Sequence, residues 1–142
     1  MAEKQIADIM RDFVGSMGER DVEKTLSFFT DDAVWETPMG TFKGKDELRR
    51  YLSAETMQNL KTTECGNGII VEGNKSFFEH VISGTYQGQR GEVLAMCAYE
   101  FSDDKIKALR TTFDRLSLAQ QTAKGWLPKW LVNFIAKQTE KL

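Results

Sequence analysis

Residues 21–52, DVEKTLSFFTDDAVWETPMGTFKGKDELRRYL, carry the local signals that decide the fold. Asp21 is a favoured helix-capping residue, so a helix is expected to follow it. The buried side of this helix is predicted to be Val22, Leu26, Phe28 and Phe29. The segment AVWETP then alternates in polarity, Pro38 ends that run, and Met39-Gly40 forms a turn into Thr41-Phe42. This pattern predicts a short strand hairpin.

Helices are also predicted on both sides of this hairpin. Residues 3–17 place apolar side chains at spacings of three and four, which is the stripe of an amphipathic helix, and Gly18 ends it. The members of that stripe are Ile6, Ile9, Met10, Phe13, Val14 and Met17. Gly44 precedes the next helix. Its stripe is Leu48, Tyr51, Leu52 and, near its fraying end, Met57.

After Lys61 the apolar period becomes two, which predicts strands. The runs lie near 62–72, 75–86, 90–102 and 105–114. They are separated by Gly73-Asn74, Gly88-Gln89 and Asp103-Asp104, which are typical of hairpin turns. Residues 1–142 are therefore predicted to form one α+β domain, with helices packed on one face of an antiparallel sheet.

The tail, residues 125–142, is predicted to form a further amphipathic helix over about 126–140. Pro128 falls in its first turn, where proline is tolerated. Its apolar side holds Trp126, Leu127, Trp130, Leu131, Phe134 and Ile135. Such a face must be covered, by the mouth of this domain as a lid, by a partner subunit, or by an anionic membrane surface. The helix is short and Glu140 reduces its basic charge, which favours protein over lipid.

The composition narrows the classes of function. Apolar residues make up 41% of the chain and charged residues 28%, and the net charge is -2 with interspersed signs. This balance excludes the basic surface that nucleic-acid binding requires. No apolar run is long enough for a membrane span, and the N-terminus is unlike a secretory signal. Cys65 and Cys97 are isolated, which predicts reduced thiols in a cytoplasmic protein and no metal site.

Residues 21–52 resemble the first half of the SnoaL-like families. The shared features are a helix ending in FFTDDAV, a strand, a Pro-Met-Gly turn and the helix start GKDEL, and IKALRTTFDRLSL resembles the families' last strand. The resemblance covers about residues 3–118. It implies the cystatin-like cone of the nuclear transport factor 2-like superfamily, in which N-terminal helices pack on a curved mixed sheet. Relatives include ketosteroid isomerases, polyketide cyclases, dehydratases, epoxide hydrolases and non-catalytic binding domains, and the fold alone does not choose among them.

By a residue-by-residue comparison, this chain lacks the catalytic groups of two of these relatives. Ketosteroid isomerases of this fold place a carboxylate base where this chain has Thr37, and their oxyanion pocket matches Phe13 and Leu94. The positions that match the epoxide hydrolase triad are His80, Ile82 and Thr111. No acid remains at any of these positions.

Alternation along the strands, combined with the resemblance, predicts which side chains line the interior of the cone. The predicted lining is Phe13, Trp35, Thr37, Phe78, His80, Ile82, Leu94, Met96, Leu109, Thr111 and Phe113. Such a pocket is mostly apolar with a few polar atoms, which suits an apolar small molecule.

His80 is the only histidine and the candidate general acid or base. The alternative is a buried imidazole held by a neighbouring hydroxyl or backbone group. Thr37 and Thr111 are candidates for positioning a ligand oxygen. The predicted function is binding of a small apolar ring compound of polyketide, terpene or steroid type. An enzymatic form would catalyse isomerisation, cyclisation or dehydration by proton transfer, without a cofactor. The rival is a non-catalytic ligand-binding or dimeric interaction domain, and a homodimer is expected.

Overall fold

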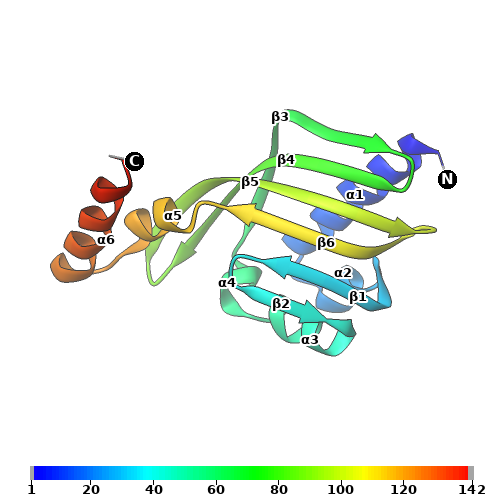
Figure 1. Ribbon diagram of the computed structural model, residues 1–142. Helices are drawn as coiled ribbons and strands as arrows, with labels where there is room; N and C mark the ends of the chain where they lie inside the picture. Colours follow the sequence, from blue (N-terminus) through cyan, green and yellow to red (C-terminus); the bar gives the residue numbers. More distant parts are fainter. Residues whose placement is uncertain (1, 141–142) are drawn as a thin grey trace.

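The computed structural model describes residues 2–140 as helices packed on one curved sheet (Figure 1). The helices are α1 (Glu3–Gly18), α2 (Val22–Leu26), α3 (Gly44–Leu52), α4 (Glu55–Gln58), α5 (Arg115–Thr122) and α6 (Trp126–Thr139). The strands are β1 (Phe29–Thr37), β2 (Gly40–Lys43), β3 (Lys61–Glu72), β4 (Lys75–Tyr86), β5 (Gln89–Ser102) and β6 (Lys105–Phe113). This order confirms the predicted α+β architecture.

The strands form one mixed sheet in the order β2-β1-β6-β5-β4-β3. Only the β1–β6 pair is parallel among the strand pairs of the described chain. The helices α1, α2 and α3 lie behind the sheet in the view of Figure 1, so they cover one face, here called the concave face. The opposite face, here called the convex face, is not covered by these helices. This arrangement confirms the nuclear transport factor 2-like cone.

The second helix is shorter than predicted. Asp21 caps it as expected, because its carboxylate accepts a hydrogen bond from the Lys24 amide at 2.9 Å. However, α2 ends at Leu26, and Phe29 already belongs to β1. The Phe28 carbonyl accepts a hydrogen bond from the Ile106 amide at 2.8 Å, so pairing with β6 replaces a further helical turn. The helical spacing of the two phenylalanines was therefore misleading.

Two further helices differ from the predicted boundaries. Met57 belongs to the separate helix α4, because α3 ends at Leu52. Residues 115–118, which resemble the end of a strand in sequence, form the first turn of α5. The Asp114 carboxylate accepts a hydrogen bond from the Ser117 amide at 3.0 Å and thereby caps this helix. A local side-chain cap thus ends β6 at Phe113, close to the predicted run 105–114 but earlier than the family resemblance suggests.

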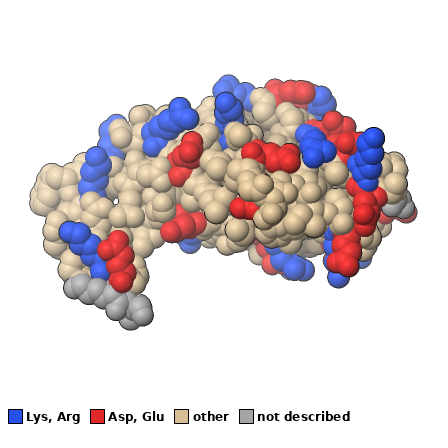
Figure 2. Space-filling view, turned by 90° about the horizontal axis from the view of Figure 1, so that it is seen from above, with Lys and Arg blue, Asp and Glu red and all other residues tan. Residues whose placement is uncertain are grey.

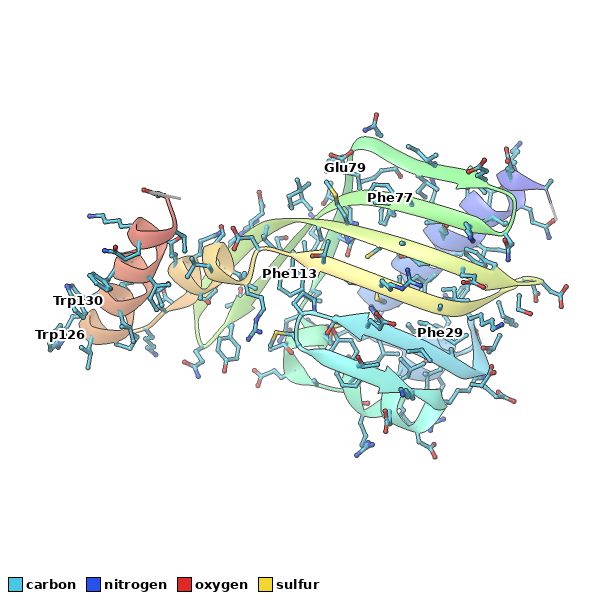
Figure 3. The ribbon with its side chains drawn as sticks, viewed as in Figure 1. Phe29, Phe77, Glu79, Phe113, Trp126 and Trp130 are labelled. Atoms are coloured by element: carbon cyan, nitrogen blue, oxygen red, sulfur yellow. The ribbon has the colours of Figure 1, made fainter. Side chains whose placement is uncertain are left out.

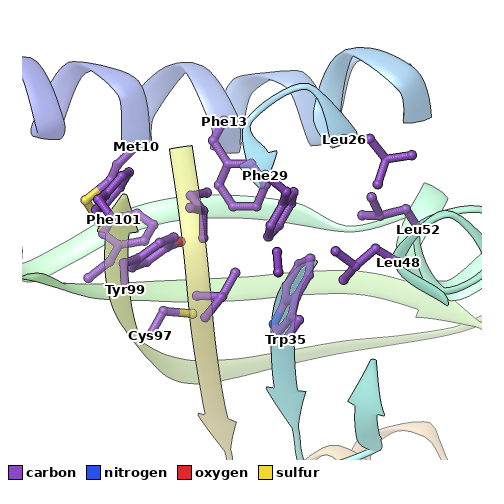
Figure 4. Packing of buried hydrophobic residues seen from close by; sticks show 14 of the residues in the cluster. Met10, Phe13, Leu26, Phe29, Trp35, Leu48, Leu52, Cys97, Tyr99 and Phe101 are labelled. Carbon is purple, nitrogen blue, oxygen red and sulfur yellow. The ribbon is translucent and has the colours of Figure 1, made fainter. Parts of the chain in front are cut away.

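The core lies between α1 and the concave face and is largely aromatic (Figure 4). The Phe13 ring is fully buried and packs edge-on against Phe29, Trp35 and Tyr99, with ring centroids 5.3, 6.1 and 6.2 Å away. Leu26, Leu48 and Leu52 extend this cluster along the inner sides of α2 and α3. The α1 end of the cone is therefore filled by side chains.

Strand β5 presents the opposite face to the one predicted. Leu94 and Met96 are 48% and 37% exposed and lie on the convex face. The buried residues of β5 are Gly91, Val93, Ala95, Cys97, Tyr99 and Phe101. The prediction was wrong because residues 93–98 are apolar on both sides, so local alternation did not distinguish the faces. Leu94 is the residue matched to the acid of the ketosteroid isomerase pocket. Its neighbours Val93 and Ala95, which do face inward, are not acids either.

The predicted C-terminal helix is present as α6 and projects from one end of the sheet (Figure 1). It packs against α5, where the Gln120 amide donates a hydrogen bond to the Asn133 side chain at 3.1 Å. Ala136 is buried, but the six large apolar residues of the helix are 44–80% exposed. In this arrangement α6 does not cover the concave face. None of the helices described in residues 2–140 has the length and apolar character needed to cross a bilayer.

Candidate functional site

The predicted lining residues divide into two groups by burial. Phe13, Trp35, Phe78 and Leu109 are at most 4% exposed and belong to the packed core, so they do not border a hollow. Ile82, Thr111 and Phe113 are half-buried on the concave face. The half-buried part of the predicted site is thus the end away from α1, here called the open end, and His80 lies beneath it with 5% exposure.

Strand register brings four polar side chains together under the open end. Cys97 pairs with Phe78 on one side and with Thr111 on the other, and Trp35 pairs with Leu109. The Trp35 indole donates a hydrogen bond to the Thr111 hydroxyl at 2.9 Å. The Cys97 sulfur lies 3.2 Å from that hydroxyl and 3.9 Å from Nε2 of His80. We call Trp35, Thr111, Cys97 and His80 the polar chain.

The partners of the polar chain assign its protons. Nδ1 of His80 lies 3.3 Å from the Phe78 carbonyl, which can only accept, so Nδ1 carries the proton. Nε2 is then an acceptor for the Cys97 thiol. The Thr111 hydroxyl accepts from Trp35 and is free to donate to the Cys97 sulfur. Each member therefore has a partner within the protein, as buried polar groups require.

Burial keeps the polar chain uncharged near neutral pH. Desolvation lowers the pKa of His80 from its ordinary value, and the hydrogen bond to the Phe78 carbonyl opposes this shift. Desolvation also raises the pKa of Cys97 to about 11, although hydrogen bonds from Thr111 and Tyr99 partly offset it. The imidazole is thus a neutral hydrogen-bonding group or base, and the thiol is not a ready nucleophile. Cys97 belongs to this constellation but was not predicted to, because its strand was assigned the wrong face.

Thr37 has a structural role in the β1–β2 turn. Its hydroxyl accepts a hydrogen bond from the Met39 amide at 3.0 Å and donates one to the Gly40 carbonyl at 3.1 Å. These bonds direct the hydroxyl to the turn, so the structure gives no support to its predicted role in positioning a ligand oxygen. Tyr51 lies nearby, and its ring stacks on Phe42 with centroids 4.1 Å apart.

Two hollows lie outside the predicted lining. One of about 480 Å³ opens between β2 and α3, and it is lined by Thr41, Phe42, Glu47, Arg50, Tyr51 and Ala54. The other has a volume of about 10 Å³, close to the minimum that one water molecule needs. Neither corresponds to the pocket predicted inside the cone. Within residues 2–140, no three His, Cys, Asp or Glu side chains gather in a way that could hold a metal ion.

Comparisons with known proteins agree with this fold. A family model described as a SnoaL-like domain matches residues 10–109. No match is found among curated proteins. A nuclear transport factor 2-like protein from Burkholderia xenovorans superposes with a TM-score of 0.73 at 21% identity, covering 86% of this chain and 98% of that chain.

Two solved enzymes are also similar in structure. An epoxide hydrolase of the LEH-like type from M. tuberculosis has a TM-score of 0.72 at 17% identity, covering 95% of this chain and 98% of its own. SalBIII, an epoxide hydrolase/cyclase-like enzyme in pyran ring formation of salinomycin, has a TM-score of 0.73 at 15% identity, with 81% and 95% covered. At these identities the likeness concerns the fold alone. Because the family model spans most of the domain, this chain belongs to the SnoaL-like domain family.

Proposed function

We propose that the chain binds a small, mostly apolar ring compound of polyketide, terpene or steroid type at the open end of the concave face. One observation carries the proposal: Thr111, the half-buried member of the polar chain, lies on the same face as the half-buried Ile82 and Phe113. Apolar walls beside one hydroxyl are the usual composition of a site for such a ligand. The ring would lie on Ile82 and Phe113, and a ligand hydroxyl would donate to the Thr111 oxygen.

The expected affinity is modest because the site is open. A ligand of about 20 heavy atoms at about 0.3 kcal/mol per atom gains about 6 kcal/mol, which corresponds to a dissociation constant of tens of micromolar. Amide NMR titration of the full chain with a steroid ketone, a hydroxylated naphthoquinone and a monoterpene alcohol tests the proposal. At least one compound should shift the signals of β4 and β6 in a saturable way.

The variant Phe113→Ala should weaken binding about tenfold, since it removes a large apolar wall. The variant Met39→Ala is the matched control, because Met39 is an exposed apolar residue of the β1–β2 turn, and its affinity should equal that of the native chain. If none of the compounds binds saturably, or if both variants bind equally well, the site proposal is wrong.

Proton transfer is a second candidate function, favoured by the unprotonated Nε2 of His80 at the end of the polar chain. A neutral imidazole can remove an acidic C–H proton from a bound ketone once the Cys97 thiol releases its hydrogen bond to Nε2. Deuterium exchange of that proton in heavy water, followed by NMR, should be faster with the native protein than with His80→Gln. Equal exchange rates for the two proteins would exclude proton transfer by His80. They would leave the binding proposal unchanged, because the NMR titration tests binding separately.

A further inference from the structure

The exposed side of α6 is a contiguous apolar surface. It consists of six large side chains of this helix, here called the α6 face, which are between 44% and 80% exposed: Trp126, Leu127, Trp130, Leu131, Phe134 and Ile135. The rings of Trp130 and Phe134 stack on each other with centroids 5.6 Å apart. Contiguous apolar patches of this size mark interaction sites.

The packing of α6 on α5 turns this face away from the rest of the molecule. The contact side of α6 holds Ala136, which is 7% exposed, and Asn133, whose side chain accepts a hydrogen bond from the Gln120 amide at 3.1 Å. At about 3.6 residues per turn, these two positions lie on the other side of the helix from the middle of the α6 face. Figure 3 shows Trp126 and Trp130 at the outer end of the molecule, away from the sheet. A flat surface can therefore approach the α6 face from outside.

The two C-terminal helices carry only positive side-chain charge. Residues 115–139 contain no Asp or Glu, and their four basic residues are Arg115, Lys124, Lys129 and Lys137. This segment therefore has a formal charge of +4, whereas the rest of the chain has -6, because the whole chain carries -2. Lys137 follows Trp130 by seven residues, which places it on the same side of α6 as that ring.

The acidic residues that adjoin this segment do not reverse its charge. Asp114 caps α5 and Glu140 follows α6, so each lies at one end of the segment. The Glu92 amide donates a hydrogen bond to the Gln121 side chain of α5 at 2.8 Å, but the Glu92 carboxylate lies 3.9 Å from the Arg90 guanidinium. In Figure 2 the end of the molecule that carries α6 is mostly uncharged, with cationic side chains and one acidic group at its edges. The charge beside the α6 face is thus mainly positive.

The other two covers expected from the sequence fit this face less well. To act as a lid, α6 would have to leave its contact with α5 and turn over, because its apolar side points away from the concave face (Figure 1). Two α6 faces from two copies of the chain would bury about 1,000 Å² in total, if each of their side chains buries about 80 Å². That area is below the standard size of a stable, specific interface.

We propose that the α6 face docks on an anionic lipid surface, with α6 lying in the plane of the membrane. Its apolar side chains enter the boundary between headgroups and acyl chains, where tryptophan rings are favoured, and the neighbouring lysines pair with anionic headgroups. The 14 residues of α6 extend about 21 Å, which suits a helix that lies on a bilayer. In sequence, the short helix and Glu140 favoured a protein partner. The outward direction of the face and the absence of acids from residues 115–139 reverse that preference.

Flotation of the full chain with lipid vesicles tests the proposal. Its partition onto vesicles of mixed phosphatidylserine and phosphatidylcholine should exceed that onto pure phosphatidylcholine at least about tenfold, because several lysines lie near the anionic surface. Added salt should weaken the difference. Two of the three tryptophans belong to the α6 face, and the third, Trp35, is buried. A blue shift of tryptophan emission on binding therefore reports entry of the α6 face into the bilayer.

Matched variants separate the apolar contact from the charge. Trp130→Glu should lower the partition onto the mixed vesicles at least about tenfold, because it removes a large apolar side chain and adds a repelled charge. Met39→Glu is the control, because it adds the same charge at a residue that is 63% exposed and lies outside the α6 face, and it should bind as the native chain does. The double variant Lys129→Gln, Lys137→Gln should lose much of the preference for phosphatidylserine. Circular dichroism checks that every variant is folded.

The proposal is overturned if the native chain does not float with the mixed vesicles, if it binds pure phosphatidylcholine equally well, or if Trp130→Glu binds like Met39→Glu. Sedimentation velocity without lipid tests the rival occupant. If the native chain is a dimer that Trp130→Glu converts to a monomer, the α6 face is a protein contact, and the lipid proposal is wrong.

Discussion

Replacing Thr111 by valine tests whether the polar chain holds the interior together. Valine keeps the shape of threonine but removes the hydroxyl, which lies 2.9 Å from the Trp35 indole nitrogen and 3.2 Å from the Cys97 sulfur. Because Trp35 is only 4% exposed, its N–H would be left without an acceptor. An unsatisfied buried donor costs about 1–3 kcal/mol, so the free energy of unfolding should fall by about 2 kcal/mol. For a domain of this size the melting temperature should fall by about 4–8 °C.

Thr112→Val is the matched control for this experiment. Thr112 is the next residue of β6 but is exposed on the convex face, so its replacement should change the free energy of unfolding by less than about 0.5 kcal/mol. Urea unfolding followed by far-ultraviolet circular dichroism measures both variants, and the indole N–H signal of Trp35 in NMR reports the hydrogen bond. If Thr111→Val and Thr112→Val are equally stable, or if the indole signal does not move in Thr111→Val, the hydrogen-bonded chain does not stabilise the fold.

Three shorter predictions follow from the same contacts. Ala95→Asp places a charge in the core and should unfold the protein, whereas the Leu94→Asp protein, with its charge on the convex face, should remain folded. The reverse result in thermal melts would mean that Leu94, and not Ala95, faces the core. Because burial lowers the pKa of His80, the unfolded chain binds its proton more readily, so stability should decline as pH falls below about 6.5. His80→Asn should reduce that slope in urea midpoints measured between about pH 7 and about pH 5, and an unchanged slope would exclude His80 as its source. Iodoacetamide at neutral pH should label Cys65 before Cys97, whose thiol is buried with a pKa of about 11, and equal labelling in mass spectra would contradict this.

The sequence was most informative where a signal is local. The α1 stripe, the Asp21 cap and the hairpin turns appear in the structure where their patterns predicted them. The face of β4 that carries His80 was predicted to point inward, and His80 is buried. Its assignment depended on the family resemblance, because both faces of that strand are mixed in polarity.

The buried face of β5 could have been identified from a longer stretch of the sequence. Residues 93–98 are apolar on both sides, but Glu92 and Glu100 share the parity of Leu94 and Met96. Placing those charges outward would have put Cys97 and Tyr99 inward, as the structure does. The alternation is informative only at the charged ends of this strand, because an apolar residue is tolerated on either face of a sheet.

By itself the sequence determined the order of α1, α2, α3, α6 and the six strands and the apolar character of α6, because caps, turns and periodicity act over a few residues. Only the tertiary structure decided which atoms meet beneath the open end. Trp35, Cys97, Thr111 and His80 come from four different strands, and their contacts depend on register between segments as much as 76 residues apart. The physical reason is that a hydrogen bond requires atoms to be placed within a few tenths of an ångström. Only the packing of the whole sheet against its helices sets positions so closely.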